Sequence, residues 1–165
     1  MFIRFSLSVL SASLVCIGLT QAACIPNEPL TRPDSRYEAV DNKGAQVKDL
    51  DTGLVWQRCV HGQQWDGKTC AGDPIAQDWN LAVKTANAAG WRLPTQKELQ
   101  SLSETSCSEL ALNQTWFGSG PSGWVWTSSD MGSPDGAVVV HSGSSLIANL
   151  IKKIPLFVRR VRHGA

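Results

Sequence analysis

Residues 91–99, WRLPTQKEL, constrain the fold of this chain more than any other segment. Thr95 and Glu98 have the spacing of a capping box, in which each side chain accepts a hydrogen bond from a backbone amide at the start of a helix. Pro94 disfavours helical angles in the residue before it, so the chain enters the helix in an extended conformation. The pattern predicts a strand-like segment that turns sharply into a short helix, with Trp91 directed into a core.

Three further blocks of sequence accompany this segment. They are DTGLVWQ at residues 51–57, WVWTSS at residues 124–129 and VRRVR at residues 158–162. In this order and spacing the four blocks resemble one bacterial family, the Lcl C-terminal domain family, over about residues 36–162. The resemblance implies a C-type-lectin-like fold and, as the best-understood role in the family, adhesion through sulfated glycans. It also implies a structural role for residues within the blocks, namely Trp56, Trp91, Arg92, Pro94, Thr95, Glu98, Trp124, Trp126 and Arg159.

The first 22 residues are typical of an export signal. Arg4 precedes an apolar run at residues 5–19 that is short for a membrane span, and small residues then predict cleavage after Ala22. Lipidation of Cys24 is the alternative, although Gln21 stands where a lipoprotein signal prefers an aliphatic residue. We therefore expect a periplasmic or secreted protein without a transmembrane segment after cleavage. It would consist of an arm at residues 23–35 and one domain at residues 36–165.

Four cysteines follow the predicted signal, and an even number in an oxidising compartment predicts two disulfides. Four cysteines allow three connectivities. We favour Cys59–Cys70, because the glycines between them allow the loop to return on itself, and this leaves Cys24–Cys107. The alternative is a metal site at Cys59, His61 and Cys70, but this spacing matches no standard zinc motif. We expect no metal and no cofactor.

The order of the elements predicts an α+β domain in which two short helices pack on antiparallel sheets. The longer helix, residues 78–89, has one apolar stripe, with Asp78 to cap its start and Gly90 its end. The second helix follows Thr95 and ends near residue 103. Strands are expected at residues 36–40, 45–50, 54–56, 124–128, 136–141, 146–150 and 155–162.

The sequence contains no recognisable catalytic motif, so we expect no enzymatic activity. Neither a nucleophile elbow nor a phosphate-binding loop is present. His141 and Ser142 could belong to a triad with Asp135 only if the fold brought them together. The cysteine spacing also differs from that of formylglycine-generating enzymes, which share the lectin-like fold. The loop at residues 130–136 offers two carboxylates for a weak calcium ion, but a polar turn is the simpler interpretation.

The tryptophans divide into two groups. Trp124 and Trp126 share one face of a predicted strand, where they belong to the core or form an exposed platform for sugar rings. Trp65 and Trp116 lie in polar, glycine-rich surroundings and are the better candidates for contact with a ligand.

The basic residues are concentrated at the end of the chain. The last 26 residues carry a formal charge of +5, whereas the remainder after the signal carries −5. Such asymmetry favours binding of a sulfated or phosphorylated polymer. We expect an exposed set of Lys152, Lys153, Arg160 and Arg162. Strand alternation further predicts that one arginine of the last strand is buried against a carboxylate, such as that of Glu98 or of an aspartate. Arg92 is expected to have a similar structural role. The alternative is that these charges only protect an edge strand.

Two functions remain open. The first is a lectin-like binding module for an anionic glycan or an envelope component, without a nucleic-acid partner. Unlike the adhesin that gives the family its name, this chain has no collagen-like repeat to make it multivalent. The second is an envelope protein-binding inhibitor, immunity factor or accessory subunit, which would use the loop around Trp65.

Overall fold

The computed structural model describes residues 25, 28–106, 112–117, 120–130 and 132–164. The predicted signal at residues 1–22, Cys24 and Cys107 lie outside the described residues. No helix among the described residues has the length and apolar character needed to cross a bilayer.

The chain is an α+β domain built on antiparallel sheets, as predicted. The first main sheet has the order β1-β2-β3-β9, the second β6-β7-β8, and β4 and β5 form a small hairpin. The elements are η1 (Asp34–Arg36), β1 (Tyr37–Ala39), β2 (Gln46–Asp49), β3 (Leu54–Gln57), β4 (Gln64–Trp65), β5 (Cys70–Ala71), α1 (Trp79–Ala86), α2 (Gln96–Ser101), α3 (Gln114–Phe117), β6 (Trp124–Trp126), β7 (Gly136–His141), β8 (Ile147–Ile151) and β9 (Val161–His163).

The described residues contain three α-helices instead of the two expected. Helix α3 has only four residues, Gln114–Phe117, which is too short to give a helical periodicity in the sequence. The hairpin of β4 and β5 was also missed, because each strand has two residues. The end of α1 differs as well, since the helix stops at Ala86 with Asn87 as its C-cap, before Gly90.

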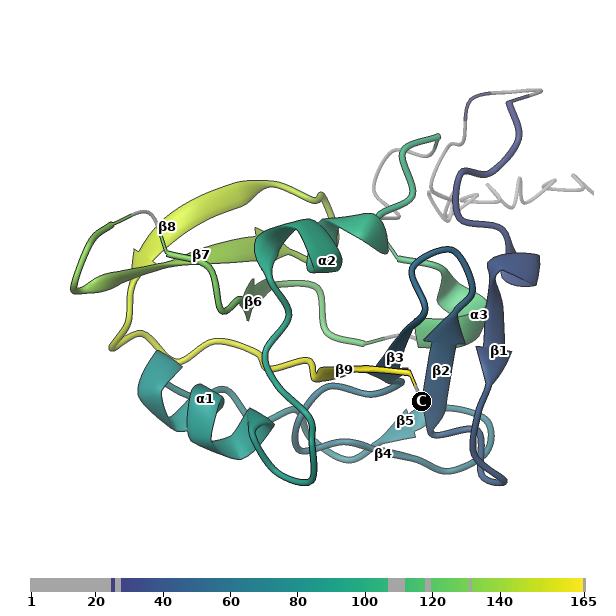
Figure 1. Ribbon diagram of the computed structural model, residues 1–165, viewed down its shortest axis with the longest axis horizontal. Coiled ribbons are helices and arrows are strands. Elements are labelled where there is room, and N and C mark those ends of the chain that lie inside the picture. The colour runs from purple at the N-terminus through teal and green to yellow at the C-terminus, as the bar shows by residue number, and fades with distance from the viewer. Residues whose placement is uncertain (1–24, 26–27, 107–111, 118–119, 131, 165) are drawn as a thin grey trace, which may run out of the picture.

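The end of the chain returns to its beginning, so that β9 pairs with β3 beside β2 and β1 (Figure 1). Figure 1 also shows α2 above the junction of the two main sheets and α1 on the opposite side. In place of the predicted strand at residues 155–162, the chain forms isolated bridges before β9 and at its first residue. Phe157 pairs with Val125 of β6, Leu156 pairs with Gln77, and Val161 pairs with Arg92.

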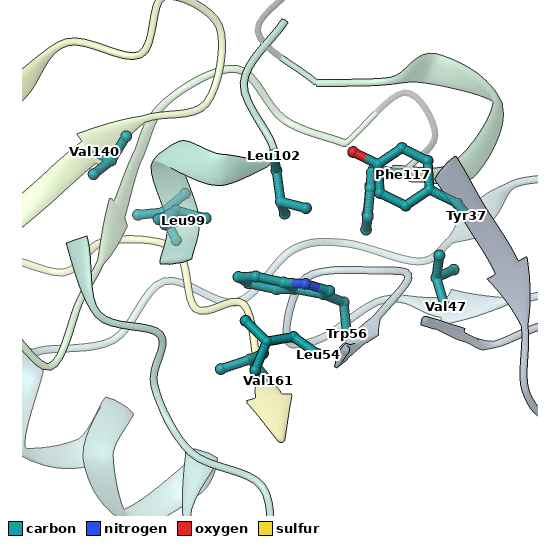
Figure 2. Packing of buried hydrophobic residues seen from close by; sticks show 10 residues of the cluster. Tyr37, Val47, Leu54, Trp56, Leu99, Leu102, Phe117, Val140 and Val161 are labelled. Carbon is teal, nitrogen blue, oxygen red and sulfur yellow. The ribbon is translucent and has the colours of Figure 1, made fainter. Parts of the chain in front are cut away.

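The hydrophobic core consists of two clusters. Trp56 is fully buried at the centre of the first cluster, between Leu102 on one side and Leu54 with Val161 on the other (Figure 2). Trp126 is fully buried in the second cluster, which also includes residues of β7 and α1. Trp91 is buried and Trp124 is half-buried against the second cluster, so none of these tryptophans forms an exposed platform.

The predicted capping box is present at the start of α2. The Thr95 hydroxyl accepts a hydrogen bond from the Glu98 amide (3.2 Å), and Glu98 Oε2 accepts one from the Thr95 amide (2.7 Å). The two carboxylate oxygens of Glu98 also accept hydrogen bonds from Arg92, each at 2.7 Å. One carboxylate therefore caps the helix and fixes the preceding extended segment.

The arginines of the last segment differ from the prediction. Val158 and Arg159 are both buried, so the expected alternation of faces is wrong there. The cause is that this segment forms single bridges to several elements in place of a continuous ladder. Arg159 has no carboxylate partner among the described residues. Its guanidinium donates instead to the carbonyl oxygens of Gln57 (3.1 Å) and Arg58 (2.8 Å).

The predicted Cys59–Cys70 disulfide is confirmed, with a Cα–Cα distance of 5.5 Å. Because the two sulfurs bond to each other, they are not available as metal ligands, and the alternative zinc site is wrong. The Cys24–Cys107 bridge stays a prediction. The neighbouring residues support it, because the Ile25 amide donates to the Ser106 carbonyl (2.8 Å).

A buried ion pair that the sequence analysis missed stabilises the first sheet. Arg36 donates two hydrogen bonds to Asp49, at 2.7 and 2.6 Å, and Asp49 is fully buried. Arg36 also lies 3.2 Å from the exposed carboxylate of Asp51. The partners are 13 residues apart on different elements, so no local pattern pointed to them.

We predict that Asp49→Asn lowers the free energy of unfolding by about 3 kcal/mol, because it removes the buried carboxylate that pairs with Arg36 and leaves only the exposed Asp51 as a charged partner. Glu38→Gln is the control, since Glu38 forms an exposed ion pair with Lys48 at 3.7 Å and should contribute less than about 1 kcal/mol. Urea denaturation of both variants measures the difference. Equal losses for the two substitutions would contradict the assignment.

We also predict an acid-dependent contribution from Glu98. Hydrogen bonds from Arg92, together with the Thr95 amide, lower the pKa of Glu98 from 4.5 to about 2. Because the folded-state pKa is the lower one, the stabilisation is complete above pH 4.5 and is lost as the pH falls towards 2. The stability gap between the native protein and Glu98→Gln should therefore shrink by about 2–3 kcal/mol over this interval. Urea denaturation at several pH values tests this, and a gap that does not change with pH would contradict it.

Candidate functional site

Two adjoining hollows lie where the end of β8 meets the start of α1. Their volumes are about 470 and 440 Å³, and they share Asn80, Lys152 and Lys153 in their walls. Lys84 of α1 contributes a third lysine to the first hollow. The other lining residues are Asp78 and Leu81 in the first hollow, and Pro134, Asp135 and Ile151 in the second. We call this region the lysine hollow.

Backbone contacts fix the position of the lysine hollow. The Trp79 amide at the start of α1 donates to the Lys152 carbonyl, and the Lys152 amide donates to the Asp135 carbonyl, both at 2.8 Å. The Asp78 side chain caps α1 by accepting from the Leu81 amide (3.0 Å). The two lysines after β8 are therefore attached to the first turn of α1, which explains why residues far apart in sequence form one wall.

The two predicted ligand lysines, Lys152 and Lys153, differ in how firmly the surrounding residues hold their side chains. Lys152 donates through Nζ to the Pro134 carbonyl (3.0 Å), and the same nitrogen lies 4.6 Å from the centroid of the Trp79 ring. These contacts hold its ammonium group in place while leaving further donors free. Lys153 is exposed. The site thus combines one ammonium group that is held by its neighbours, that of Lys152, with the exposed side chain of Lys153.

The charges of the lysine hollow are mixed. Its three lysines exceed its two aspartates, Asp78 and Asp135. A purely anionic polymer such as nucleic acid prefers a continuous basic surface. Cations beside carboxylates and an amide suit a ligand that carries both negative groups and hydroxyl groups.

Arg160 and Arg162 do not line the lysine hollow, so the predicted basic set is divided. Both are half-buried instead of exposed. Arg162 donates to Gln46 Oε1 (3.0 Å) and its guanidinium lies 5.1 Å from the centroid of the Trp91 ring. Burial lowers the pKa of Arg160. Their contacts belong to the first sheet, which leaves Lys152 and Lys153 as the ligand candidates of the set.

Trp65 and Trp116 come together around Arg58, a residue that the sequence analysis did not identify. The Arg58 guanidinium lies 3.5 Å from the centroid of the Trp65 ring and 5.3 Å from that of Trp116. It also donates to the carbonyls of Gly44 (3.1 Å) and Thr115 (2.6 Å). Both tryptophans are half-buried, so their contacts attach the disulfide hairpin and α3 to the first sheet. No pattern in the sequence marks Arg58.

The remaining candidate residues are not assembled into a catalytic or calcium site by the described part of the chain. Asp135 and His141 flank opposite ends of β7, which separates them by about 20 Å at the rise of a strand. His141 Nδ1 lies 3.1 Å from the Ser144 hydroxyl in the turn after β7. Asp130 accepts a hydrogen bond from the Gly132 amide, as in an ordinary polar turn.

We predict that Arg58→Lys destabilises the protein by about 1–3 kcal/mol, because a lysine cannot stack as a plane between two indoles while donating to two carbonyls. Arg160→Lys is the matched control, since Arg160 is a half-buried arginine with no side-chain hydrogen bond among the described residues. It should cost less than about 0.5 kcal/mol. Thermal or urea unfolding compares the two. A larger effect at Arg160 would contradict the role assigned to Arg58.

Comparison with known proteins agrees with the four blocks of sequence. The family model described as the Lcl C-terminal domain matches residues 45–162, which include all four blocks and extend from the edge of β2 into β9. A search of curated proteins finds no match. Because the family model spans most of the sequence, the chain belongs to the Lcl C-terminal domain family.

Proposed function

We propose that this protein is an exported, non-catalytic binding module that holds an anionic glycan in the lysine hollow. The observation that carries the proposal is the convergence of Lys84, Lys152 and Lys153 around Asn80 in two adjoining hollows. Sulfate or carboxylate groups of the glycan would pair with the ammonium groups. Asn80, Asp78 and Asp135 would exchange hydrogen bonds with its hydroxyl groups.

The architecture of the site supports a polysaccharide over a small free ligand. The two hollows are open to solvent and adjoin each other along α1 and the end of β8, and the exposed side chains of Leu81 and Ile151 are among their lining residues. A small ligand is usually enclosed on most sides by a deeper, largely apolar pocket. An extended chain of sugars could follow both hollows and place successive anionic groups near the lysines.

Export is supported by two independent features. The N-terminal sequence predicts a signal that is cleaved after Ala22, and the Cys59–Cys70 disulfide fits an oxidising compartment. The proposed location is the periplasm or the cell exterior, with lipidation of Cys24 as the alternative. Either location would give the lysine hollow access to envelope or surface glycans.

The test is the retention of residues 23–165 on immobilised heparin in a salt gradient. We expect elution above physiological salt for the native chain. The double variant Lys152→Glu/Lys153→Glu should elute at or below physiological salt, because it replaces two attractive charges by repulsive ones. Lys84→Glu should give an intermediate loss.

The matched control is Lys43→Glu/Lys97→Glu, which makes the same change in net charge at two exposed lysines outside the hollow. It should retain most of the affinity. If both double variants lose retention equally, binding depends on net charge alone and the site is wrong. If the native chain flows through at low salt, the glycan proposal is wrong.

A further inference from the structure

Strand β8 forms a free edge of the second sheet. Among the residues that the structure describes it pairs only with β7, in the sheet order β6-β7-β8, and Figure 1 shows no labelled element on its other side. One face of β8 is covered, because Ala148 and Leu150 pack against the second core cluster, but this packing leaves the edge of the strand open. The edge is therefore available to another strand.

The hydrogen-bond pattern shows which backbone groups point outward. The His141 amide donates to the Leu146 carbonyl, and the Lys152 amide donates to the Asp135 carbonyl. In an antiparallel pair, residues directed at the partner strand alternate with residues directed away from it. Ile147, Asn149 and Ile151 consequently direct their amide and carbonyl groups away from β7. Among the described residues, the only backbone partner beyond the sheet is the turn amide of Ile154, which donates to Ile151.

The side chains of this edge lack the usual protection. Ile147 is 45% exposed and Ile151 is 59% exposed, and Leu146 just before the strand is 62% exposed. Residues 146–151 contain no charged residue, proline or glycine. Edge strands in monomeric proteins are normally short, charged or interrupted to prevent pairing with another chain. A five-residue uncharged edge with two exposed isoleucines indicates an interface.

We propose that β8 pairs antiparallel with β8 of a second copy of this chain, about a twofold axis at Asn149. This register pairs all three outward-facing residues with outward-facing residues. Four backbone hydrogen bonds can form without the Ile151 carbonyl, which already accepts from the Ile154 amide. The two three-stranded sheets would then join into one sheet of six strands.

The strand is complementary to itself in this register. Ile147 lies opposite Ile151 of the second copy, so each exposed apolar side chain meets another. Lys152 lies opposite Leu146 of the second copy, so no two lysines face each other. Because residues 146–151 carry no charge, they do not favour a charged peptide over a second copy of the chain. A symmetric, self-complementary patch is what a twofold dimer requires.

The dimer would also affect ligand binding. Lys152 of one copy and Lys152 of the other would be six residues apart along the paired strands, or about 20 Å. One long polyanion could then reach both lysine hollows, which would replace the multivalency that a collagen-like repeat supplies. This consequence rests on the proposed function, whereas the pairing itself does not.

The first experiment is sedimentation equilibrium of residues 23–165 over a range of concentrations, without any glycan. We expect a monomer–dimer equilibrium. Ile147→Lys/Asn149→Lys should weaken association by at least about tenfold, because the introduced charges oppose each other across the axis. The control Leu50→Lys/Ile75→Lys introduces the same two charges at two exposed apolar positions outside β8 and should associate like the native chain. Circular dichroism checks that the variants are folded.

Disulfide trapping tests the register separately. Asn149→Cys should give a covalent dimer on mild oxidation, because the axis places the two introduced thiols on directly opposed residues. Ile147→Cys should not, because its two copies would be about 14 Å apart. A monomer at every concentration, a dimer that the β8 lysines do not weaken, or equal trapping at both positions would overturn the proposal. Loss of heparin binding alone would overturn only the proposed function.

Discussion

The segment that leads into β9 is the contact on which the rest of the structure depends. Within six residues its backbone bonds to both main sheets and to the segments around them: the His61 amide donates to Val158, the Trp126 amide to Phe157, and the Gln57 amide to Arg160. Val161 then bridges to Arg92, next to the capped start of α2. The four sequence blocks meet here, because this segment is the last of them and touches the other three. Without it, the two core clusters would lack their common wall.

Buried arginines fix this arrangement at a cost in desolvation. Arg159 is 2% exposed, and burial lowers its pKa to about 10. It is held by carbonyl oxygens at the end of β3 and by the ring of Phe117, 5.3 Å from its guanidinium. Arg58 also lacks a carboxylate partner among the described residues and stacks against the indole rings of Trp65 and Trp116. Arg36, in contrast, pairs with the carboxylate of Asp49. Planar guanidinium groups with several donors can satisfy scattered acceptors that a lysine could not. These three arginines are thus buried in the fold and do not contribute to a basic surface.

This use of arginine decides which charges remain for binding. The count of basic residues near the C-terminus predicted one basic face, but of that set Lys152 and Lys153 alone line the lysine hollow in the described part of the chain, with Lys84 added from α1. These lysines lie at the surface because they follow an edge strand, where Lys152 is held by the Pro134 carbonyl and Lys153 is exposed. The same edge strand, with its exposed isoleucines, offers the route to a dimer. The proposed glycan site and the proposed dimer interface therefore both lie at β8 and the residues that follow it.

The sequence by itself determined the local features: the capping box at Thr95 and Glu98, the Asp78 cap, the Cys59–Cys70 loop and the alternation of strands and helices. These depend on residues a few positions apart, whose geometry the backbone dictates. Only the tertiary structure decided that Arg36 meets Asp49, that Arg58 lies between Trp65 and Trp116, and that Arg159 is buried without an acid. Such contacts join distant segments, and their energy depends on burial, which an arginine in the sequence does not reveal. The lysine hollow belongs to the second group, because α1 and the end of β8 become neighbours only after the sheets have packed.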